Sequence, residues 1–118
     1  MDRRKEQAEI ISQVMLADGI FSMWLKTEAS HTAKPGQFIS MYTNDGSKLL
    51  PRPISICEID SVKGRLRVVY RVTGENTGTE QFSRMQSGDT LSIIGPLGNG
   101  FPLEKAEGKN VFLMGGGI

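Results

Sequence analysis

The sequence Ile20-Phe21-Ser22-Met23-Trp24-Leu25-Lys26 alternates between two sets of residues, one of which is wholly apolar. This period of two is that of a half-buried β-strand, with Phe21, Met23 and Leu25 on the face that meets the core. Similar segments lie on both sides of it, separated by turn residues such as Asp18-Gly19 and Pro35-Gly36. They predict further strands at residues 9–15, 37–43, 54–59, 66–72 and 90–94. Short strands at this spacing predict an all-β fold, a closed antiparallel barrel.

One short helix is expected within this pattern, at residues 79–85. Phe82 and Met85 lie three residues apart and therefore share one face of that helix. Thr77 or Gly78 is placed to cap its start, and Ser87-Gly88-Asp89 is expected to end it.

The composition is that of one globular domain with little net charge. The chain has 118 residues, and 14 Lys and Arg against 13 Asp and Glu give a formal net charge of +1. A single-strand binder needs a basic groove with stacking rings, yet only 7% of the residues are aromatic. We therefore expect no nucleic-acid partner, and a non-enzymatic oligonucleotide-binding barrel is the disfavoured alternative.

The cysteine content and the N-terminal residues bear on the location of the protein. The single cysteine, Cys57, excludes an internal disulfide, and it excludes a cluster or structural zinc held by cysteines of this chain. Ser12, Gln13, Asp18 and Ser22 interrupt the apolar residues near the N-terminus, so neither a signal peptide nor a membrane span is expected. These observations predict a cytoplasmic setting with no membrane partner.

The last residues follow a different pattern. A continuous apolar run at 111–114 leads directly into three glycines at 115–117. Such a strand-to-glycine junction opens the phosphate-binding turn of a doubly wound nucleotide-binding domain. We expect this segment to be the beginning of such a domain in a longer polypeptide; a flexible glycine tail is the alternative.

Three motifs then occur in order: Arg52-Pro53-Ile54-Ser55, Val69-Tyr70-Arg71 with Gly78-Thr79 after it, and Gly95-Pro96-Leu97-Gly98-Asn99-Gly100-Phe101. Together they resemble the FAD-binding barrel of the ferredoxin-reductase-like flavoproteins, and within that group the electron-transfer subunits of NAD-dependent (type B) dihydroorotate dehydrogenase. The resemblance covers nearly the whole chain. It implies a Greek-key FAD-binding barrel at residues 1–103, followed at 104–118 by a linker and the first strand of a truncated nucleotide-binding domain.

The resemblance assigns FAD to residues of the first two motifs. The cofactor-binding residues that it implies are Arg52, Pro53, Ile54, Ser55, Val69, Tyr70, Arg71, Gly78 and Thr79. Arg52 and Arg71 suit the doubly charged pyrophosphate, because a guanidinium offers paired donors. The alternative is that both are ordinary solvated strand residues; the two prolines that flank Arg52 count against this, because they fix its backbone.

Several of the other residues keep two interpretations. By resemblance, Ser55 donates or accepts hydrogen bonds at the flavin nitrogens. Gly78-Thr79 either meets the pyrophosphate or merely caps the helix, and which Gly or Thr of 73–79 makes that contact stays open. Tyr70 either helps to cover the flavin or packs in the core. Cys57 faces the same side as Ser55, and burial as a small hydrophobe is favoured over a place near the flavin.

The glycines of 95–100 also have two interpretations: they allow close passage of a planar ligand, or they make a tight connection. His31 is expected at the surface, and the sequence contains no pattern typical of a nucleophile triad or a metal site.

By resemblance, the whole protein is an oxidoreductase subunit of pyrimidine biosynthesis. Dihydroorotate is oxidised at the FMN of a catalytic partner subunit, in a heterotetramer, and electrons pass through [2Fe-2S] and FAD to NAD. The 118 residues alone are expected to bind FAD weakly and neither to reduce NAD nor to carry the cluster. The alternative within the same group is the FAD domain of another ferredoxin–NADP reductase or of a sulfide dehydrogenase subunit. The choice between NAD and NADP, the flavin potential and the oligomeric state do not follow from these residues.

Overall fold

A computed structural model of the chain describes residues 5–43, 50–74, 77–102, 105 and 107–110. Its elements are six strands, one 3-10 helix and one α-helix, in the order β1 (Glu6–Ala17), β2 (Ile20–Lys26), η1 (Glu28–His31), β3 (Phe38–Tyr42), β4 (Arg52–Asp60), β5 (Arg65–Arg71), α1 (Gly78–Ser83) and β6 (Thr90–Leu97). The six strands predicted for the barrel are all present. Residues 44–47, which lie between two of these strands and are expected to form a loop, and the predicted strand at 111–114 lie outside the described residues.

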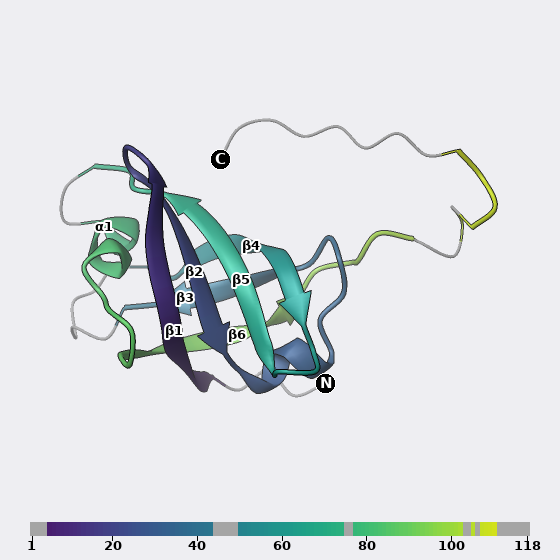
Figure 1. Cartoon of the computed structure of the whole chain (residues 1–118), viewed down its shortest axis with the longest axis horizontal. Coiled ribbons are helices and arrows are strands. Elements are labelled where there is room, and N and C mark those ends of the chain that lie inside the picture. The colour runs from purple at the N-terminus through teal and green to yellow at the C-terminus, as the bar shows by residue number, and fades with distance from the viewer. Residues whose placement is uncertain (1–4, 44–49, 75–76, 103–104, 106, 111–118) are drawn as a thin grey trace.

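The strands close into a barrel in the order β1-β2-β5-β4-β3-β6, and every neighbouring pair is antiparallel. Strands β3, β4 and β5 form consecutive hairpins, whereas β2 reaches its place beside β5 through a long connection. This order is that of a Greek key, so the predicted fold is confirmed. Figure 1 shows α1 at the end of the barrel where β5 finishes.

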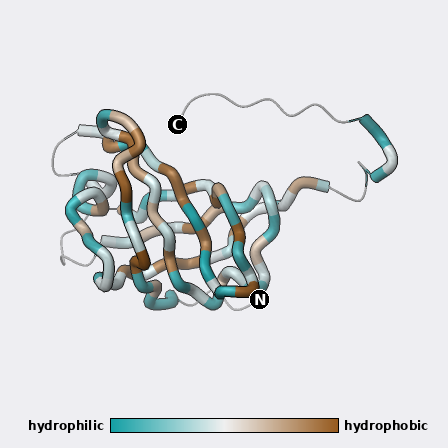
Figure 2. The backbone as a smooth tube through the Cα atoms, viewed as in Figure 1, coloured by the Kyte–Doolittle hydropathy of each residue, from teal (hydrophilic) through white to brown (hydrophobic). Residues whose placement is uncertain are grey.

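The barrel interior is filled by apolar side chains, which alternate along the strands with residues facing outward. Figure 2 shows hydrophobic and hydrophilic residues following one another along the strands. The fully buried side chains include those predicted from β2, Met23 and Leu25, and also Phe82 from α1. The buried apolar residues are Ala8, Ile10, Met23, Leu25, Ala29, Ile39, Met41, Leu66, Val68, Tyr70, Phe82, Leu91 and Ile93.

Strand β1 is longer than the predicted strand at 9–15, and it contains a bulge. Its pairing with β2 is Ile10↔Leu25 and then Gln13↔Met23, with a register shift between Ile10 and Ser12. An extra residue in one strand reverses which side chains face the core beyond it. Ile10 and Gln13 therefore both turn toward the interior, although they are an odd number of residues apart.

Helix α1 is shorter than predicted and ends before residues 87–89. Thr77 is its N-cap, and its hydroxyl accepts a hydrogen bond from the backbone N–H of Glu80 at 3.3 Å. At the other end, Arg84 N–H donates to Gln81 O at 3.2 Å and Met85 N–H to Phe82 O at 3.1 Å. These tight three-residue bonds close the helix two residues earlier than the apolar spacing indicates. In the described part of the chain, no helix has the length and apolar character to cross a bilayer.

Candidate functional site

A pocket of about 600 Å³ lies on the outside of the barrel, over β4 and β5. It is at the end where β4 begins, β5 finishes and α1 starts (Figure 1). The described side chains of its lining include two cations and no carboxylate, which makes the pocket suited to an anionic ligand. The residues that line it are Arg52, Pro53, Ile54, Ser55, Cys57, Val69, Tyr70, Arg71, Thr73 and Thr79.

The alternation along β4 presents one row of side chains to this pocket. Pro53, Ser55 and Cys57 are exposed, whereas Ile54 and Ile56 pack against the core. The interpretation of Cys57 as a buried small hydrophobe is therefore wrong, because the two isoleucines beside it occupy the inward face. The thiol lies in the pocket with Ser55, as their shared direction indicates.

Arg52 and Arg71 differ in their electrostatic environment from the other arginines of β4 and β5. Among the described residues, neither Arg52 nor Arg71 has a carboxylate within ion-pair distance. The other two arginines of these strands are paired: Arg65 with Asp60 at 3.2 Å and Arg67 with Glu58 at 3.1 Å. The two guanidiniums without protein partners are thus the two in the pocket, where their paired donors are free for an anion.

The start of α1 forms the wall of the pocket beside Arg52. A Cβ added to Gly78 would lie 3.0 Å from Arg52 Cγ, so the absence of a side chain lets the arginine stem pack there. Thr79 is buried, and its hydroxyl accepts a hydrogen bond from Thr73 N–H at 3.0 Å. This hydroxyl also lies 3.1 Å from Thr73 Oγ1 and 3.2 Å from Thr77 Oγ1. The threonines therefore hold the end of β5 and the start of α1 together.

Tyr70 lines the pocket from the inside, and its ring belongs to the core. The ring stacks on Phe21 with centroids 5.8 Å apart and meets Phe82 edge-on at 6.3 Å. Burial raises the pKa of the Tyr70 phenol, so it stays protonated and donates to Gln13 Oε1 at 2.5 Å. Of the two interpretations of Tyr70, the structure supports core packing.

The sequence matches the family of oxidoreductase FAD-binding domains over residues 7–101. This chain belongs to that family. Curated relatives of the FAD-binding domain are named dihydroorotate dehydrogenase B (NAD(+)), electron transfer subunit. That of Enterococcus faecalis is 42% identical over 120 residues, covering 100% of this chain and 45% of the relative. That of Streptococcus thermophilus is 45% identical over 114 residues, covering 96% and 44%. The chain thus spans a little under half the length of these relatives.

Solved structures share the fold of this FAD-binding domain. The structure of an NADH-dependent reduced ferredoxin-NADP oxidoreductase, described for flavin-based electron bifurcation, superposes with a TM-score of 0.70 and 28% identity. The match covers 79% of this chain and 33% of that one. The ferredoxin reductase in carbazole 1,9a-dioxygenase gives the same TM-score of 0.70 at 21% identity, covering 80% and 30%. The latter likeness concerns the fold alone.

The glycine segment 95–101 of the FAD-binding domain packs against its own barrel. A Cβ on Gly95 would lie 2.7 Å from Ile39 Cγ2, and one on Gly98 would lie 3.0 Å from the Phe38 ring. Phe101 N–H donates to Pro35 O at 2.8 Å. No residue of this segment lines the β4–β5 pocket. The observed contacts are those of a tight connection, the second of its two interpretations.

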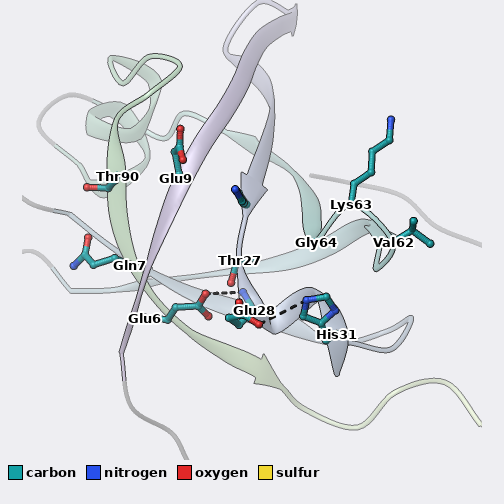
Figure 3. Close-up of a pocket in the computed structure, with 11 residues that line it drawn as sticks. Glu6, Gln7, Glu9, Thr27, Glu28, His31, Val62, Lys63, Gly64 and Thr90 are labelled. Carbon is teal, nitrogen blue, oxygen red and sulfur yellow. Dashed lines mark hydrogen bonds and ion pairs between the residues drawn. The ribbon is translucent and has the colours of Figure 1, made fainter.

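A second hollow, of about 690 Å³, lies where β1, β2 and η1 meet (Figure 3). Its charges are mixed, because Glu6, Glu9 and Glu28 line it together with Lys26 and Lys63. Glu28 N–H donates to Glu6 Oε2 at 2.6 Å, and His31 Nε2 lies 3.6 Å from Glu28 Oε2. His31 is exposed, as predicted. Across the described ranges, no group of three or more potential ligands is arranged to hold a metal ion. The β4–β5 pocket is therefore the candidate functional site.

Proposed function

We propose that this chain binds FAD in the β4–β5 pocket. The observation that carries the proposal is that Arg52 and Arg71, the two arginines of β4 and β5 without carboxylate partners among the described residues, line one pocket whose described lining residues include no acid. Two guanidiniums in one pocket match the two charges of a pyrophosphate. The family to which the chain belongs is named for the same cofactor.

The pocket residues divide into two groups on this proposal. Arg52 and Arg71, with the turn at Gly78-Thr79, hold the pyrophosphate end. Ser55 offers a hydroxyl beside the flavin ring, and Pro53, Ile54 and Val69 give it apolar surface. Tyr70 supports the site from the core side, through its place in β5. On this proposal the residues of the pocket bind and orient the cofactor and exclude water.

The wider role that we propose follows the names of the relatives. The chain is the FAD-binding part, residues 1–103, of an electron-transfer subunit of dihydroorotate dehydrogenase, and 104–118 begin its nucleotide-binding domain. When bound, FAD would supply the relay between a [2Fe-2S] cluster and NAD, with dihydroorotate oxidised at the FMN of a catalytic partner in a heterotetramer. We place this protein in the cytoplasm.

A second candidate is the FAD domain of a ferredoxin–NADP oxidoreductase type of subunit. The 28% identity to the NADH-dependent enzyme of that class favours it over unrelated flavoproteins. Both candidates use the same pocket and the same arginines. Co-purification of the whole subunit with a dihydroorotate-oxidising protein of the same cell supports the first candidate, and its co-purification with a ferredoxin-reducing partner supports the second.

Titration with FAD, followed by flavin fluorescence, tests cofactor binding and the role of the arginines. Losing one hydrogen bond from a charged donor costs about 1.5–3 kcal/mol, so Arg52→Gln or Arg71→Gln should raise Kd about 10- to 150-fold. Arg65→Gln is the matched control, because Arg65 lies at the far end of β5 and already pairs with Asp60. The proposal fails if the wild-type chain does not bind FAD, or if the control weakens binding as much as the pocket variants do.

A further inference from the structure

Gln13 is a polar side chain that the fold turns toward the core. It lies on β1 just beyond the bulge, opposite Met23, and is half-buried. In an unbulged strand in register with Ile10, Ser12 would face inward in its place. The bulge thus directs an amide, with two donors and an acceptor, toward the inside of the barrel end that carries the pocket.

The Gln13 amide forms hydrogen bonds with two elements, β5 and the end of α1. Its Oε1 accepts from the Tyr70 hydroxyl of β5 at 2.5 Å. Its Nε2 donates to two backbone carbonyls at the end of α1, Phe82 O at 3.0 Å and Met85 O at 2.9 Å. Both N–H groups of the amide are therefore used and its oxygen accepts one hydrogen bond, while Phe82 O also accepts from the backbone N–H of Met85 at 3.1 Å.

The two elements joined in this way carry the two sides of the proposed pyrophosphate site. Tyr70 is followed directly by Arg71, and α1 begins with Gly78 and Thr79. A helix of six residues has little stability of its own, so its position depends on what it packs against. Phe82 anchors it to the core through apolar contact, which fixes how far it lies from the barrel. Hydrogen bonds are directional and also limit sliding and rotation.

We infer that Gln13 is a positioning residue of the FAD site: it fixes α1 relative to β5, and so fixes Thr79 relative to Arg71, without touching the ligand. This inference rests on the proposed function. Among the described residues, Gln13 is not part of the pocket lining, so its effect on FAD must pass through the two elements that it ties together. The hydrogen bonds of Gln13 to Tyr70, Phe82 and Met85, which we call the relay, also give the bulge in β1 a role at the pocket, although the strand lies elsewhere in the barrel.

The test compares Gln13→Met with Gln7→Met in the whole chain. Gln7 is on the same strand, and its Nε2 donates to Ser92 Oγ at 2.7 Å, at the end of β1 that pairs with β6. Each variant removes one glutamine amide, but only the amide of Gln13 is hydrogen-bonded to the end of α1. Each variant is first checked by chemical denaturation, and FAD is then titrated under conditions where it is fully folded.

The result expected is a rise in Kd for FAD of roughly tenfold in Gln13→Met, the effect of one misaligned charge-assisted hydrogen bond, and less than twofold in Gln7→Met. The ³¹P resonances of bound FAD should shift in Gln13→Met while the visible flavin spectrum stays that of the wild type. A general loss of structure would not shift the ³¹P resonances and leave the flavin spectrum unchanged. If Gln13→Met does not fold, Tyr70→Phe replaces it: it removes one bond of the relay, and a smaller rise in Kd with the same ³¹P shift is expected.

Three results overturn the inference while FAD binding itself holds. They are an unchanged Kd in the relay variants, an equal rise in Gln7→Met, and a change in the flavin spectrum with unchanged ³¹P resonances. Failure of the wild-type chain to bind FAD is a different result, because it refutes the proposed function and the inference with it.

Discussion

The substitution Gly78→Ala is expected to affect the stability of the chain and its affinity for FAD in different ways, because Gly78 packs against Arg52. Gly78 is the first residue of α1, and its φ is outside the left-handed region, so alanine suits the backbone. The only tight contact of the added Cβ is with Arg52 Cγ at 3.0 Å; the next atoms, Arg52 Cδ and Leu50 O, lie at 3.5 and 3.8 Å. The arginine is exposed and can yield, which moves its guanidinium away from the pocket.

The two effects have opposite signs. Gly→Ala at a compatible position reduces the entropy of the unfolded chain and stabilises by about 0.4–1 kcal/mol. The contact with Arg52 offsets part of this, so the free energy of unfolding should stay the same or rise slightly. FAD binding should weaken because Arg52 is displaced, by up to the 1.5–3 kcal/mol of a charge-assisted hydrogen bond, or about 10-fold and more in Kd.

Urea denaturation measures the first effect and a FAD titration the second. The decisive control is the double variant Arg52→Gln/Gly78→Ala, since two changes that act through one contact are not additive. In the Arg52→Gln background, Gly78→Ala should change Kd less than twofold. An equal loss of affinity in both backgrounds would refute the reasoning, because the glycine would then act through the helix and not through the arginine.

Three further predictions concern the core and the exposed thiol. Gly95→Ala places a Cβ 2.7 Å from Ile39 Cγ2 and should destabilise by about 1–3 kcal/mol in urea denaturation, with partial recovery in Gly95→Ala/Ile39→Leu, because leucine lacks the β-branch that carries Cγ2. Burial raises the pKa of Tyr70 above its unfolded value near 10, so its contribution to stability is complete below pH 10 and is lost as the pH rises above it; Tyr70→Phe should reduce that loss between pH 9 and 11. Cys57 lines the pocket, so saturating FAD should slow its alkylation by iodoacetamide several-fold, as mass spectrometry would show.

The strands could be predicted from the sequence because side-chain period and burial agree along them. In β2, Met23 and Leu25 face the core as their spacing indicates. The bulge in β1 could not be predicted, because nothing in the local sequence Ile10-Ile11-Ser12 marks an extra residue in the strand. Its presence shows only in the register of the pairing between β1 and β2. The inward turn of Gln13 follows from that bulge and was missed with it.

The site was predicted in part, through the resemblance. The residues of the first two motifs that it singled out line one pocket, apart from Gly78, which packs behind Arg52. Thr73 was not named individually, and Cys57 was expected to be buried. The alternation of Ile54 and Ile56 with Ser55 and Cys57 indicates that the thiol faces outward. The prediction of burial followed the residue type instead, because a free cysteine is often buried.

The role of Tyr70 depends on partners that no local pattern shows. Its phenol reaches Gln13, 57 residues away in the sequence, and its ring lies between Phe21 and Phe82. A tyrosine between two outward-facing residues of a strand is expected to face inward, yet whether its hydroxyl finds a partner there is a tertiary property. The polar relay behind the pocket is therefore visible only in the structure.

The most direct test of FAD binding in the β4–β5 pocket is an NMR titration that follows the backbone amides of the ¹⁵N-labelled chain. The account predicts that FAD shifts the amides of Ser55, Cys57, Val69, Arg71 and Thr79. The amides of Thr27 and Gly64, which line the second hollow, should stay in place. Shifts centred on the second hollow, or no saturable shifts at all, would contradict it.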